Sequence, residues 1–363
     1  MKDLKNYSLL AHNTFGIDAK CRRFLEYSSI EEAQQIASSL TSADEPLLIL
    51  GGGSNLLLTG DYPGTVLHSA IKGIRALDEA EVQALLKKNV SYAIPSDSDP
   101  MKSDTGSSIF LECGSGEVFD DVVAYAVEQG YHGAENLSII PGEVGASAVQ
   151  NIGAYGVEAK DIIYKVETVE IATGKLVVFD NADCQYSYRQ SKFKHEWRDK
   201  YLVTHVIYRL SRQFVPDLDY GNIRASLEQK GISEPTAQQL REVIIEIRNA
   251  KLPDPKVQGN AGSFFMNPIV EKAKYEELAA LYPGIPHYAM DAEHEKIPAG
   301  WMIDQCGWKG KSLGKAGVHD KQALVLVNRG GAKGEDIVRL CETIQKDVKE
   351  KFGIEIHPEV NVK

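Results

Sequence analysis

The densest group of residues that could do chemistry lies within residues 251–267, whose sequence is KLPDPKVQGNAGSFFMN. Two prolines restrict the backbone there, and Ser263 directly follows the turn 259–262, with Phe264 and Phe265 behind it. A serine hydroxyl on such a turn, shielded from water by aromatic rings, could act as a nucleophile or as a proton donor. Ser263 does not lie in a GxSxG nucleophile elbow, which disfavours a hydrolase that acts through this serine. The alternative is a turn serine followed by core aromatic residues.

Two charged residues elsewhere are candidates for a carboxylate site. Arg189 ends the polar sequence YSYR, and its guanidinium could hold a carboxylate through two parallel hydrogen bonds. A surface arginine on a loop is the alternative. Glu359 follows a proline near the end of the sequence, where a glutamate is normally a solvated charge. The residues alone therefore assign no role to Glu359.

Two glycine-rich segments could contact a phosphorylated ligand. Residues 51–55 (GGGSN) follow a short apolar run, and glycines after a buried strand let backbone N–H groups approach a phosphate. The segment matches neither the Rossmann nor the Walker pattern, and an ordinary tight turn is the alternative. Residues 141–156 (PGEVGASAVQNIGAYG) are also small, and a close-packed interior crossing would explain them equally well. Two such segments together favour a cofactor of dinucleotide size.

The hydrophobic pattern predicts a mixture of helices and strands without strict βαβ alternation, and therefore an α+β fold. Residues 141–156 are too rich in glycine for a confident helix. The region 78–108 contains a Ser-, Asp- and Pro-rich part without a period, and we expect a surface insertion there. Helices are predicted over residues 31–40, 117–130, 236–252, 272–281 and 334–352, and strands over 46–50, 64–71, 109–113, 166–179 (as a hairpin), 201–210, 322–328 and 354–360.

Composition narrows the class of protein. The 363 residues are 43% hydrophobic and 25% charged, which is typical of a globular protein of two or three domains. A net charge of −11 makes broad binding to nucleic acid or to anionic lipid a poor expectation. We find no apolar run long enough for a bilayer and no secretory signal, and so predict neither membrane nor nucleic acid as partner. Five cysteines without CxxC, and nine histidines without HExxH, predict no disulfide framework and no metal, as fits a reducing cytoplasm.

Taken together, the motifs resemble one family, the UDP-N-acetylenolpyruvoylglucosamine reductases (UDP-N-acetylmuramate dehydrogenases), which are flavoenzymes of peptidoglycan precursor synthesis. QNIGAYG and GNAGSFF carry most of the specificity, and the motifs span nearly the whole chain. They are Asn13-Thr14-Phe15-Gly16, Leu50-Gly51-Gly52-Gly53-Ser54-Asn55, Ile140-Pro141-Gly142, Gln150-Asn151-Ile152-Gly153-Ala154-Tyr155-Gly156, Tyr188-Arg189, residues 259–265, Ala299-Gly300-Trp301-Met302-Ile303-Asp304 and Pro358-Glu359-Val360.

The resemblance implies an FAD-binding domain of the vanillyl-alcohol-oxidase/p-cresol-methylhydroxylase type over residues 1–213, and a C-terminal α/β substrate domain over residues 214–363. It implies non-covalent FAD, NADPH as hydride donor, and UDP-N-acetylglucosamine enolpyruvate as acceptor, the last two using one cleft in turn. It also implies a cytoplasmic monomer that serves cell wall biogenesis, cell shape and cell division.

The resemblance assigns three catalytic residues. Arg189 matches the arginine that holds the substrate carboxylate, and Ser263 matches the serine that protonates the substrate carbon. Glu359 matches the glutamate that, with the arginine, stabilises an enolate-like intermediate, and it would have to be protonated or orient a water to do so.

Further residues match the family's binding sites. Tyr220 matches a substrate-covering tyrosine of one subtype, and Lys251 would meet the diphosphate. The cofactor residues would be Gly51, Gly52, Gly53, Ser54, Asn55, Gly142, Gly145, Ser147, Asn151, Ile152 and Gly153. The substrate residues would be Tyr188, Tyr220, Lys251, Asn267, Tyr288 and Gln322.

Two rival functions stay open. One is a flavin oxidase of the same superfamily that uses O2 or another acceptor, which would have no reason to carry the GNAGSFF serine and the terminal glutamate. The other is a flavin- or nucleotide-binding protein without catalysis, against which the presence of Arg189, Ser263 and Glu359 argues.

The sequence departs from the family pattern at two places. Residues 146 and 148 are alanines where serine and proline are common, and region 78–108 is longer than the family pattern.

Overall fold

The structure, a computed structural model, describes residues 1–87 and 108–363. The chain divides into two compact units, and residues 214–248 fall with the first of them. Unit 1 consists of residues 1–4, 23–51 and 64–248, and unit 2 of residues 5–22, 52–63 and 249–363.

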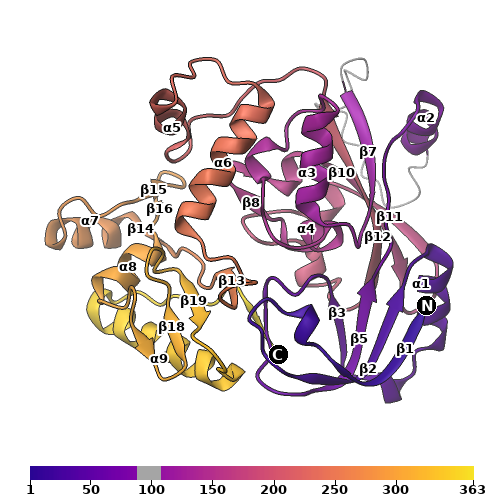
Figure 1. The fold of residues 1–363 in the computed structure, drawn as a ribbon, viewed down its shortest axis with the longest axis horizontal. Coiled ribbons are helices and arrows are strands. Elements are labelled where there is room, and N and C mark those ends of the chain that lie inside the picture. Colours follow the sequence, from indigo (N-terminus) through magenta and orange to yellow (C-terminus); the bar gives the residue numbers. More distant parts are fainter. Residues whose placement is uncertain (88–107) are drawn as a thin grey trace. The chain divides into compact units, whose positions relative to one another are not determined.

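The central sheet of unit 1 is antiparallel, and it confirms the predicted hairpin through the pairing of Val166 with Phe179. The helices α3 (Phe119–Glu128) and α4 (Val144–Gln150) lie together on one side of it (Figure 1), and α4 packs on β12. Their apolar faces form a buried core with the sheet. The strand order is β11 (Leu176–Asp180), β10 (Ile163–Glu170), β12 (Tyr201–Ser211), β7 (Ser108–Gly114) and β6 (Ile74–Ala76).

A second sheet positions the first glycine loop. The strand β3 pairs in parallel with β5, in a register that runs from Leu47–Thr65 to Leu50–His68, so that Gly51 leaves the sheet at the carboxyl edge. The helix α1 begins after Ser29, whose hydroxyl accepts a hydrogen bond from the Glu32 amide at 3.2 Å. The elements are β1 (Lys2–Ser8), β2 (Lys20–Tyr27), α1 (Ile30–Ser39), β3 (Leu47–Leu50) and β5 (Tyr62–Ser69), with the strand order β1-β2-β5-β3.

Part of the expected insertion is a helix. The helix α2 (Glu79–Lys87) buries Val82 and Leu85 against Phe110 and Ile207, so the start of region 78–108 is not an exposed loop. The polar loop predicted after it lies outside the described residues.

Two helices follow the central sheet. The helices α5 (Ile223–Gln229) and α6 (Ala237–Lys251) share a buried apolar cluster that also contacts Tyr155. Arg241 of α6 donates two hydrogen bonds to Asp120 of α3, at 2.7 and 2.9 Å. This pair fixes α6 against the core of unit 1.

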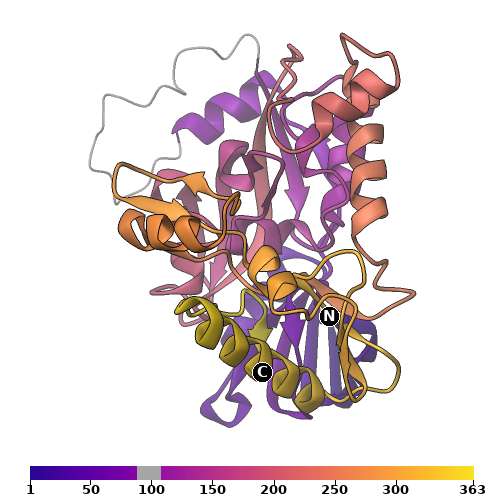
Figure 2. The same ribbon diagram turned by 90° about the vertical axis from the view of Figure 1, so that its left-hand side faces the viewer.

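Helices pack on two of the small sheets of unit 2. Figure 2 shows α7 beside the three-stranded sheet β14-β16-β15, and α9 packs on β18 and β19. The periodicity of the sequence predicted the bounds of α7 and α9 as the structure has them. The elements are β13 (Asn260–Ser263), β14 (Ile269–Glu271), α7 (Lys272–Leu281), β15 (Tyr288–Ala289), β16 (His294–Lys296), α8 (Ala299–Gln305), β17 (Ser312–Leu313), β18 (Ala316–Val318), β19 (Val325–Asn328) and α9 (Gly334–Phe352).

The last residues differ from the prediction. Residues 354–360 form no strand, and only Pro358 makes an isolated bridge, to Phe265. The final strand is β20 (Asn361–Val362), which pairs in parallel with β4 (Leu56–Leu57) of the same unit. The proline withholds a backbone donor, which limits pairing of residues 354–360 to single bridges. Within residues 1–87 and 108–363, no helix combines the length and the apolar character needed to cross a bilayer.

Candidate functional site

Arg189 is held against the backbone of the segment 141–156. Its Nη2 donates to the carbonyl oxygen of Gly153 at 2.6 Å, and its Nη1 to that of Asn151 at 3.3 Å. A Cβ at Gly153 would come within 2.9 Å of Nη1, so glycine makes room for the guanidinium. Arg189 has a φ of 57°, a left-handed conformation that is strained for a residue with a Cβ, and its guanidinium lies 5.2 Å from the ring centroid of Tyr188. The predicted carboxylate-binding arginine and the predicted cofactor loop are therefore neighbours.

The segment 141–156 contains α4, which we did not predict. The Ser147 hydroxyl shares a hydrogen bond with the Tyr208 hydroxyl at 2.7 Å. Asn151 ends α4 in a left-handed conformation, and its amide donates to the Ser187 carbonyl at 2.8 Å. The Ile152 amide donates to the Ser147 carbonyl at 3.3 Å. Cofactor contacts by these side chains would compete with bonds they already make.

Glycines of unit 1 leave space that a side chain would fill. The Gly145 amide donates to the Ser115 carbonyl at 2.8 Å, and a Cβ there would meet the Ser115 Cβ at 3.0 Å. Gly142 has a φ of 126°, which only glycine adopts readily. A Cβ at Gly51 would lie 3.3 Å from a carboxyl oxygen of Glu143. At Gly145 and Gly51, glycine is therefore needed for close packing within unit 1.

In unit 2, the remaining residues of the first glycine loop meet the C-terminal segment. Gly53 has a φ of 64°, and its carbonyl accepts the Thr14 amide at 3.2 Å. The Asn55 side-chain amide donates to the Glu359 carbonyl at 3.3 Å, and the Asn55 carbonyl accepts the Asn361 amide at 3.1 Å. Gly52 and Ser54 lie in the same turn. A predicted cofactor loop and a predicted catalytic residue are thereby joined.

Ser263 and Glu359 are also brought together. Ser263 ends β13 with its side chain exposed, while Phe264 and Phe265 behind it are fully buried. The Glu359 amide donates to the Phe264 carbonyl at 2.8 Å, which ties Glu359 to the residue next to Ser263. Ser263 is thus exposed rather than shielded from water as expected, while the two phenylalanines after it are core residues.

Two predicted substrate residues, Asn267 and Gln322, each lie beside the start of α8. The Asn267 side-chain oxygen accepts the Ala299 amide at 2.9 Å. A Cβ at Gly300 would lie 3.2 Å from the Gln322 side-chain oxygen. Lys251 is exposed at the end of α6, and Tyr288 is 46% exposed on β15 with the Lys296 ammonium 5.5 Å from its ring centroid.

Tyr220 lies against the GAYG sequence of unit 1. Its ring meets the Tyr155 ring edge-on with centroids 6.4 Å apart, and it is 42% exposed. The Asn136 amide donates to the carbonyl oxygens of Tyr155 at 2.9 Å and Asp217 at 3.1 Å, which fixes the loop before Tyr220. The covering role predicted for Tyr220 needs such an exposed, anchored ring.

Sequence reasoning missed Arg248. Its Nε is buried and has no hydrogen-bond partner among the described residues. Burial lowers the pKa of the Arg248 guanidinium, and so does the positive charge of nearby Arg189. The Tyr155 hydroxyl, which is hydrogen-bonded to Arg248, raises that pKa. Burial likewise raises the pKa of Tyr155. A second guanidinium thus stands near Arg189, and only the tertiary structure reveals it.

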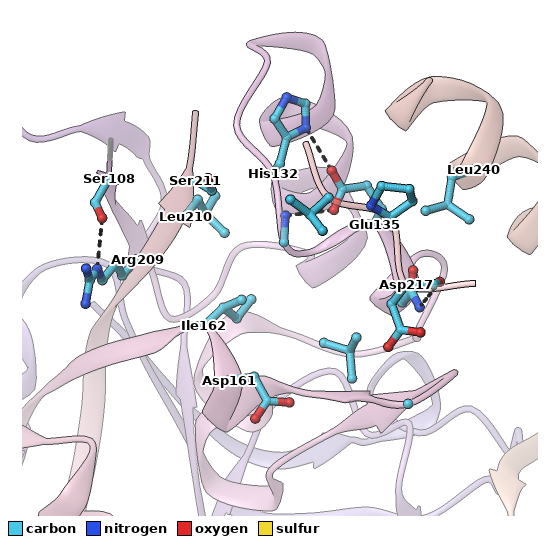
Figure 3. A pocket seen from close by; sticks show the side chains of 16 residues that line it. Ser108, His132, Glu135, Asp161, Ile162, Arg209, Leu210, Ser211, Asp217 and Leu240 are labelled. Carbon is cyan, nitrogen blue, oxygen red and sulfur yellow. Dashed lines mark hydrogen bonds and ion pairs between the residues drawn. The ribbon is translucent and has the colours of Figure 1, made fainter. Parts of the chain in front are cut away.

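A separate cavity of about 520 Å³ in unit 1 contains none of the predicted site residues (Figure 3). His132 and Glu135 pair there at 2.9 Å, and Arg209 donates to the Ser108 hydroxyl at 3.0 Å. These polar groups satisfy one another, so the cavity offers no evident chemistry. Within the described parts of the chain, no three His, Cys, Asp or Glu side chains form a possible metal site.

Comparison with known proteins defines the class. Residues 101–180 match the family described as FAD binding domain, and residues 254–363 match the C-terminal domain of UDP-N-acetylenolpyruvoylglucosamine reductase. The fold is similar to that of UDP-N-acetylenolpyruvylglucosamine reductase from Thermus caldophilus (TM-score 0.63, 21% identity, 99% of this chain and 98% of that chain). It is also similar to that of 6-hydroxy-D-nicotine oxidase from Arthrobacter nicotinovorans (TM-score 0.52, 14% identity, 98% of this chain and 86% of that chain). Fold and domain content define a flavin-dependent oxidoreductase, and the predicted α+β fold with its FAD-binding domain is confirmed.

Two relatives give the family. A UDP-N-acetylenolpyruvoylglucosamine reductase from Bacteroides fragilis is 53% identical and covers 98% of this chain and 99% of its own length. One from Flavobacterium johnsoniae is 41% identical over 100% of both chains. The chain belongs to the UDP-N-acetylenolpyruvoylglucosamine reductase family, and FAD is its cofactor.

Proposed function

We propose that this chain reduces the enolpyruvyl ether of UDP-N-acetylglucosamine to UDP-N-acetylmuramate at the expense of NADPH, in peptidoglycan precursor synthesis. The observation that carries the proposal is the exposed Ser263 hydroxyl on a strand whose next residue is bonded to the Glu359 backbone at 2.8 Å. Bound FAD would supply the redox chemistry, by taking a hydride from NADPH and passing it to the substrate methylene carbon.

Arg189 would bind the substrate carboxylate. Two of its nitrogens are already oriented by the carbonyl oxygens of Asn151 and Gly153. Because the side chain is held in place, it loses less conformational entropy when the substrate binds. A fixed guanidinium also offsets the negative charge that builds on the carboxylate and its neighbouring carbon. The buried Nε of Arg248 provides further positive charge in the same unit.

Ser263 would donate a proton to the carbon next to that carboxylate. The exposed hydroxyl is free to rotate, while buried Phe264 and Phe265 fix the backbone that carries it. Protonation of the carbon completes the reduction, because one hydride and one proton are then added across the double bond.

Glu359 would assist the same step. Its backbone is fixed by the amide bond to Phe264 and by the Asn55 amide on its carbonyl. A protonated carboxyl, or one that orients a water, could hydrogen-bond the developing negative charge, whereas an ionised one would repel it.

The remaining roles follow the family pattern. Gly51, Gly52, Gly53, Ser54 and Asn55, with the backbone of residues 142–153, would hold FAD without a covalent bond. Tyr188, Tyr220, Lys251, Asn267, Tyr288 and Gln322 would bind the UDP-sugar. We further propose that NADPH and the sugar occupy one cleft in turn, that residues 1–213 and 214–363 are the FAD and substrate halves, and that the enzyme is a cytoplasmic monomer.

An anaerobic absorption spectrum of the purified protein tests the function. Flavin bands should bleach on addition of NADPH and return on addition of the enolpyruvyl UDP-sugar. Bands that bleach but return only in air would instead indicate an oxidase, and a colourless protein that cannot be reconstituted with FAD would overturn the proposal.

A further inference from the structure

Glu143 is a carboxylic residue inside the segment 141–156, which lies in the part of the chain that matches the FAD binding domain. Its backbone is fixed on both sides: Glu143 bridges Val118, and its carbonyl accepts the Ser147 amide at 3.0 Å. The next amide, that of Val144, donates to the Glu117 carbonyl at 2.9 Å. The direction in which the side chain leaves is therefore determined by the fold.

That side chain lies against the first glycine loop. Its Oε2 is 3.3 Å from the place where a Gly51 Cβ would stand, and the Ala146 Cβ is 3.4 Å from the same place. Glu143 is partly buried, and among the described residues its carboxyl makes no hydrogen bond and no ion pair. An unpaired, half-buried carboxyl is costly to ionise, so its presence here needs an explanation.

The charges around Glu143 do not neutralise it. The facing groups are Glu26 and Tyr27 from β2 and Lys72 from the segment after β5. The Lys72 ammonium is already bonded to the Gly116 carbonyl at 2.5 Å and lies 3.5 Å from Glu117. Burial raises the pKa of Glu143 to about 8, with Lys72 opposing and Glu26 reinforcing the shift.

A diphosphate that approaches Gly51 would add negative charge beside this group. An ionised Glu143 would repel it, whereas a protonated carboxyl is a hydrogen-bond donor of the strong, charge-assisted kind. We propose that Glu143 is a cofactor-binding residue that acts in its protonated form, so that FAD binding retains or takes up one proton at this carboxyl. The inference rests on the proposed contact of Gly51 with FAD, and it takes the diphosphate as the part of FAD that lies there.

The sign of the pH dependence follows from this linkage. FAD is held most tightly while Glu143 is neutral, which is the state below about pH 8. Above about pH 8, each further pH unit lowers the affinity of the protein for FAD by up to about tenfold. This decline ends when the pH reaches the higher pKa that Glu143 has in the FAD complex. The anionic cofactor raises that second pKa because like charge disfavours ionisation.

The test is the release of FAD from the purified holoprotein, followed by flavin fluorescence after dilution from about pH 6.5 to about pH 9.5. Release of FAD from the wild-type protein should increase with pH over the upper part of this range. Glu143→Gln, which keeps a donor that cannot ionise, should hold FAD with little pH dependence. Glu26→Gln should move the onset to lower pH, since the negative charge that favours protonation of Glu143 is gone. Glu128→Gln, at an exposed position on α3, is the matched control and should behave as wild type.

Wild-type release that is independent of pH would overturn the proposal, and so would an unchanged pH dependence in Glu143→Gln. If Glu143→Gln does not fold, the proton uptake that accompanies FAD binding to the wild-type apoprotein decides between the outcomes. Titration calorimetry near pH 9, in buffers of different ionisation enthalpy, measures this uptake. About one proton per FAD supports the role, and none refutes it. These readouts need no sugar substrate, so they are independent of the spectral test of the proposed function.

Discussion

Arg189 in unit 1 is positioned by its side chain, whereas Ser263 in unit 2 is positioned by its backbone. The Arg189 guanidinium is bonded to two carbonyl oxygens and its φ is strained, and the glycine it contacts leaves no space for a Cβ. The Ser263 side chain is exposed, while β13 and the buried phenylalanines behind it hold its main chain.

This difference separates structural from chemical roles. Removal of the Ser263 hydroxyl should slow the reaction with the sugar and leave the fold intact. A change at Arg189 should affect ligand binding and local structure together, because the same nitrogens serve both. The four substitutions below test the comparison in order of decreasing effect.

Ser263→Ala should leave flavin reduction by NADPH nearly normal and slow reoxidation by the enolpyruvyl sugar by about 10²–10⁴-fold, the range of general acid catalysis. Stopped-flow absorbance of the two half-reactions measures this. Unfolding stability should change by less than about 0.5 kcal/mol because the side chain is exposed. Ser312→Ala, at the opposite edge of the same sheet, is the control. Equal slowing of both half-reactions would exclude the proton-donor role.

Arg189→Lys keeps the charge but loses the planar fork. We expect kcat/KM for the sugar to fall roughly 10- to 100-fold, from the loss of about 1.5–3 kcal/mol of charged hydrogen bonding. Stability should also fall, because the bonds to Asn151 and Gly153 are lost. Arg198→Lys, at an exposed arginine of the same unit, should alter neither quantity. Full activity in Arg189→Lys would show that no bidentate contact is made.

Gly153→Ala places a Cβ within 2.9 Å of the Arg189 Nη1 and within 2.8 Å of the Val157 carbonyl. The unfolding free energy should fall by about 1–3 kcal/mol, as is usual for overpacking. The sugar half-reaction should slow more than the NADPH half-reaction. Gly60→Ala, where a Cβ meets nothing within 4 Å, is the control for denaturant melts. An unchanged melt would mean that Arg189 does not depend on this glycine.

Tyr220→Phe should have the smallest effect, a two- to tenfold rise in KM from the loss of one neutral hydrogen bond, about 0.5–1.5 kcal/mol. The edge-on contact with Tyr155 is retained, so stability should not change. Steady-state kinetics with varied sugar concentration measures the effect. If both KM and kcat match the wild type, the hydroxyl does not contact substrate.

Local patterns predicted much of the fold. The apolar periodicity of residues 272–281 and 334–352 predicted α7 and α9 with their observed bounds, and Thr173-Gly174 predicted the β10–β11 hairpin. The helix α4 was missed because the glycines of residues 141–156 lower helix propensity, and packing on β12 overrides that preference. Neither a propensity nor a motif could show that residues 5–22 and 52–63 fold with the C-terminal part.

The candidate site was predictable where a motif fixes it, and otherwise not. Ser263 and Glu359 were found from short sequences, and the structure explains their proximity through the bond between Glu359 and Phe264. Glu143 and Arg248 carry no local signal. Their properties arise from burial and from neighbours distant in sequence, such as Lys72 and Tyr155.

The discontinuous composition of unit 2 constrains how the chain can fold during synthesis. The strand β4 can pair with β20 only after residues 361–362 have left the ribosome, because its partners are Asn361 and Val362. The Thr59 amide likewise awaits the carbonyl of Lys363. Unit 1, in contrast, has its complete sequence once residue 248 has emerged. The apolar segment Leu56–Leu57 must therefore wait for β20 until residues 361–362 are synthesised, which exposes this part of unit 2 to premature association on the nascent chain.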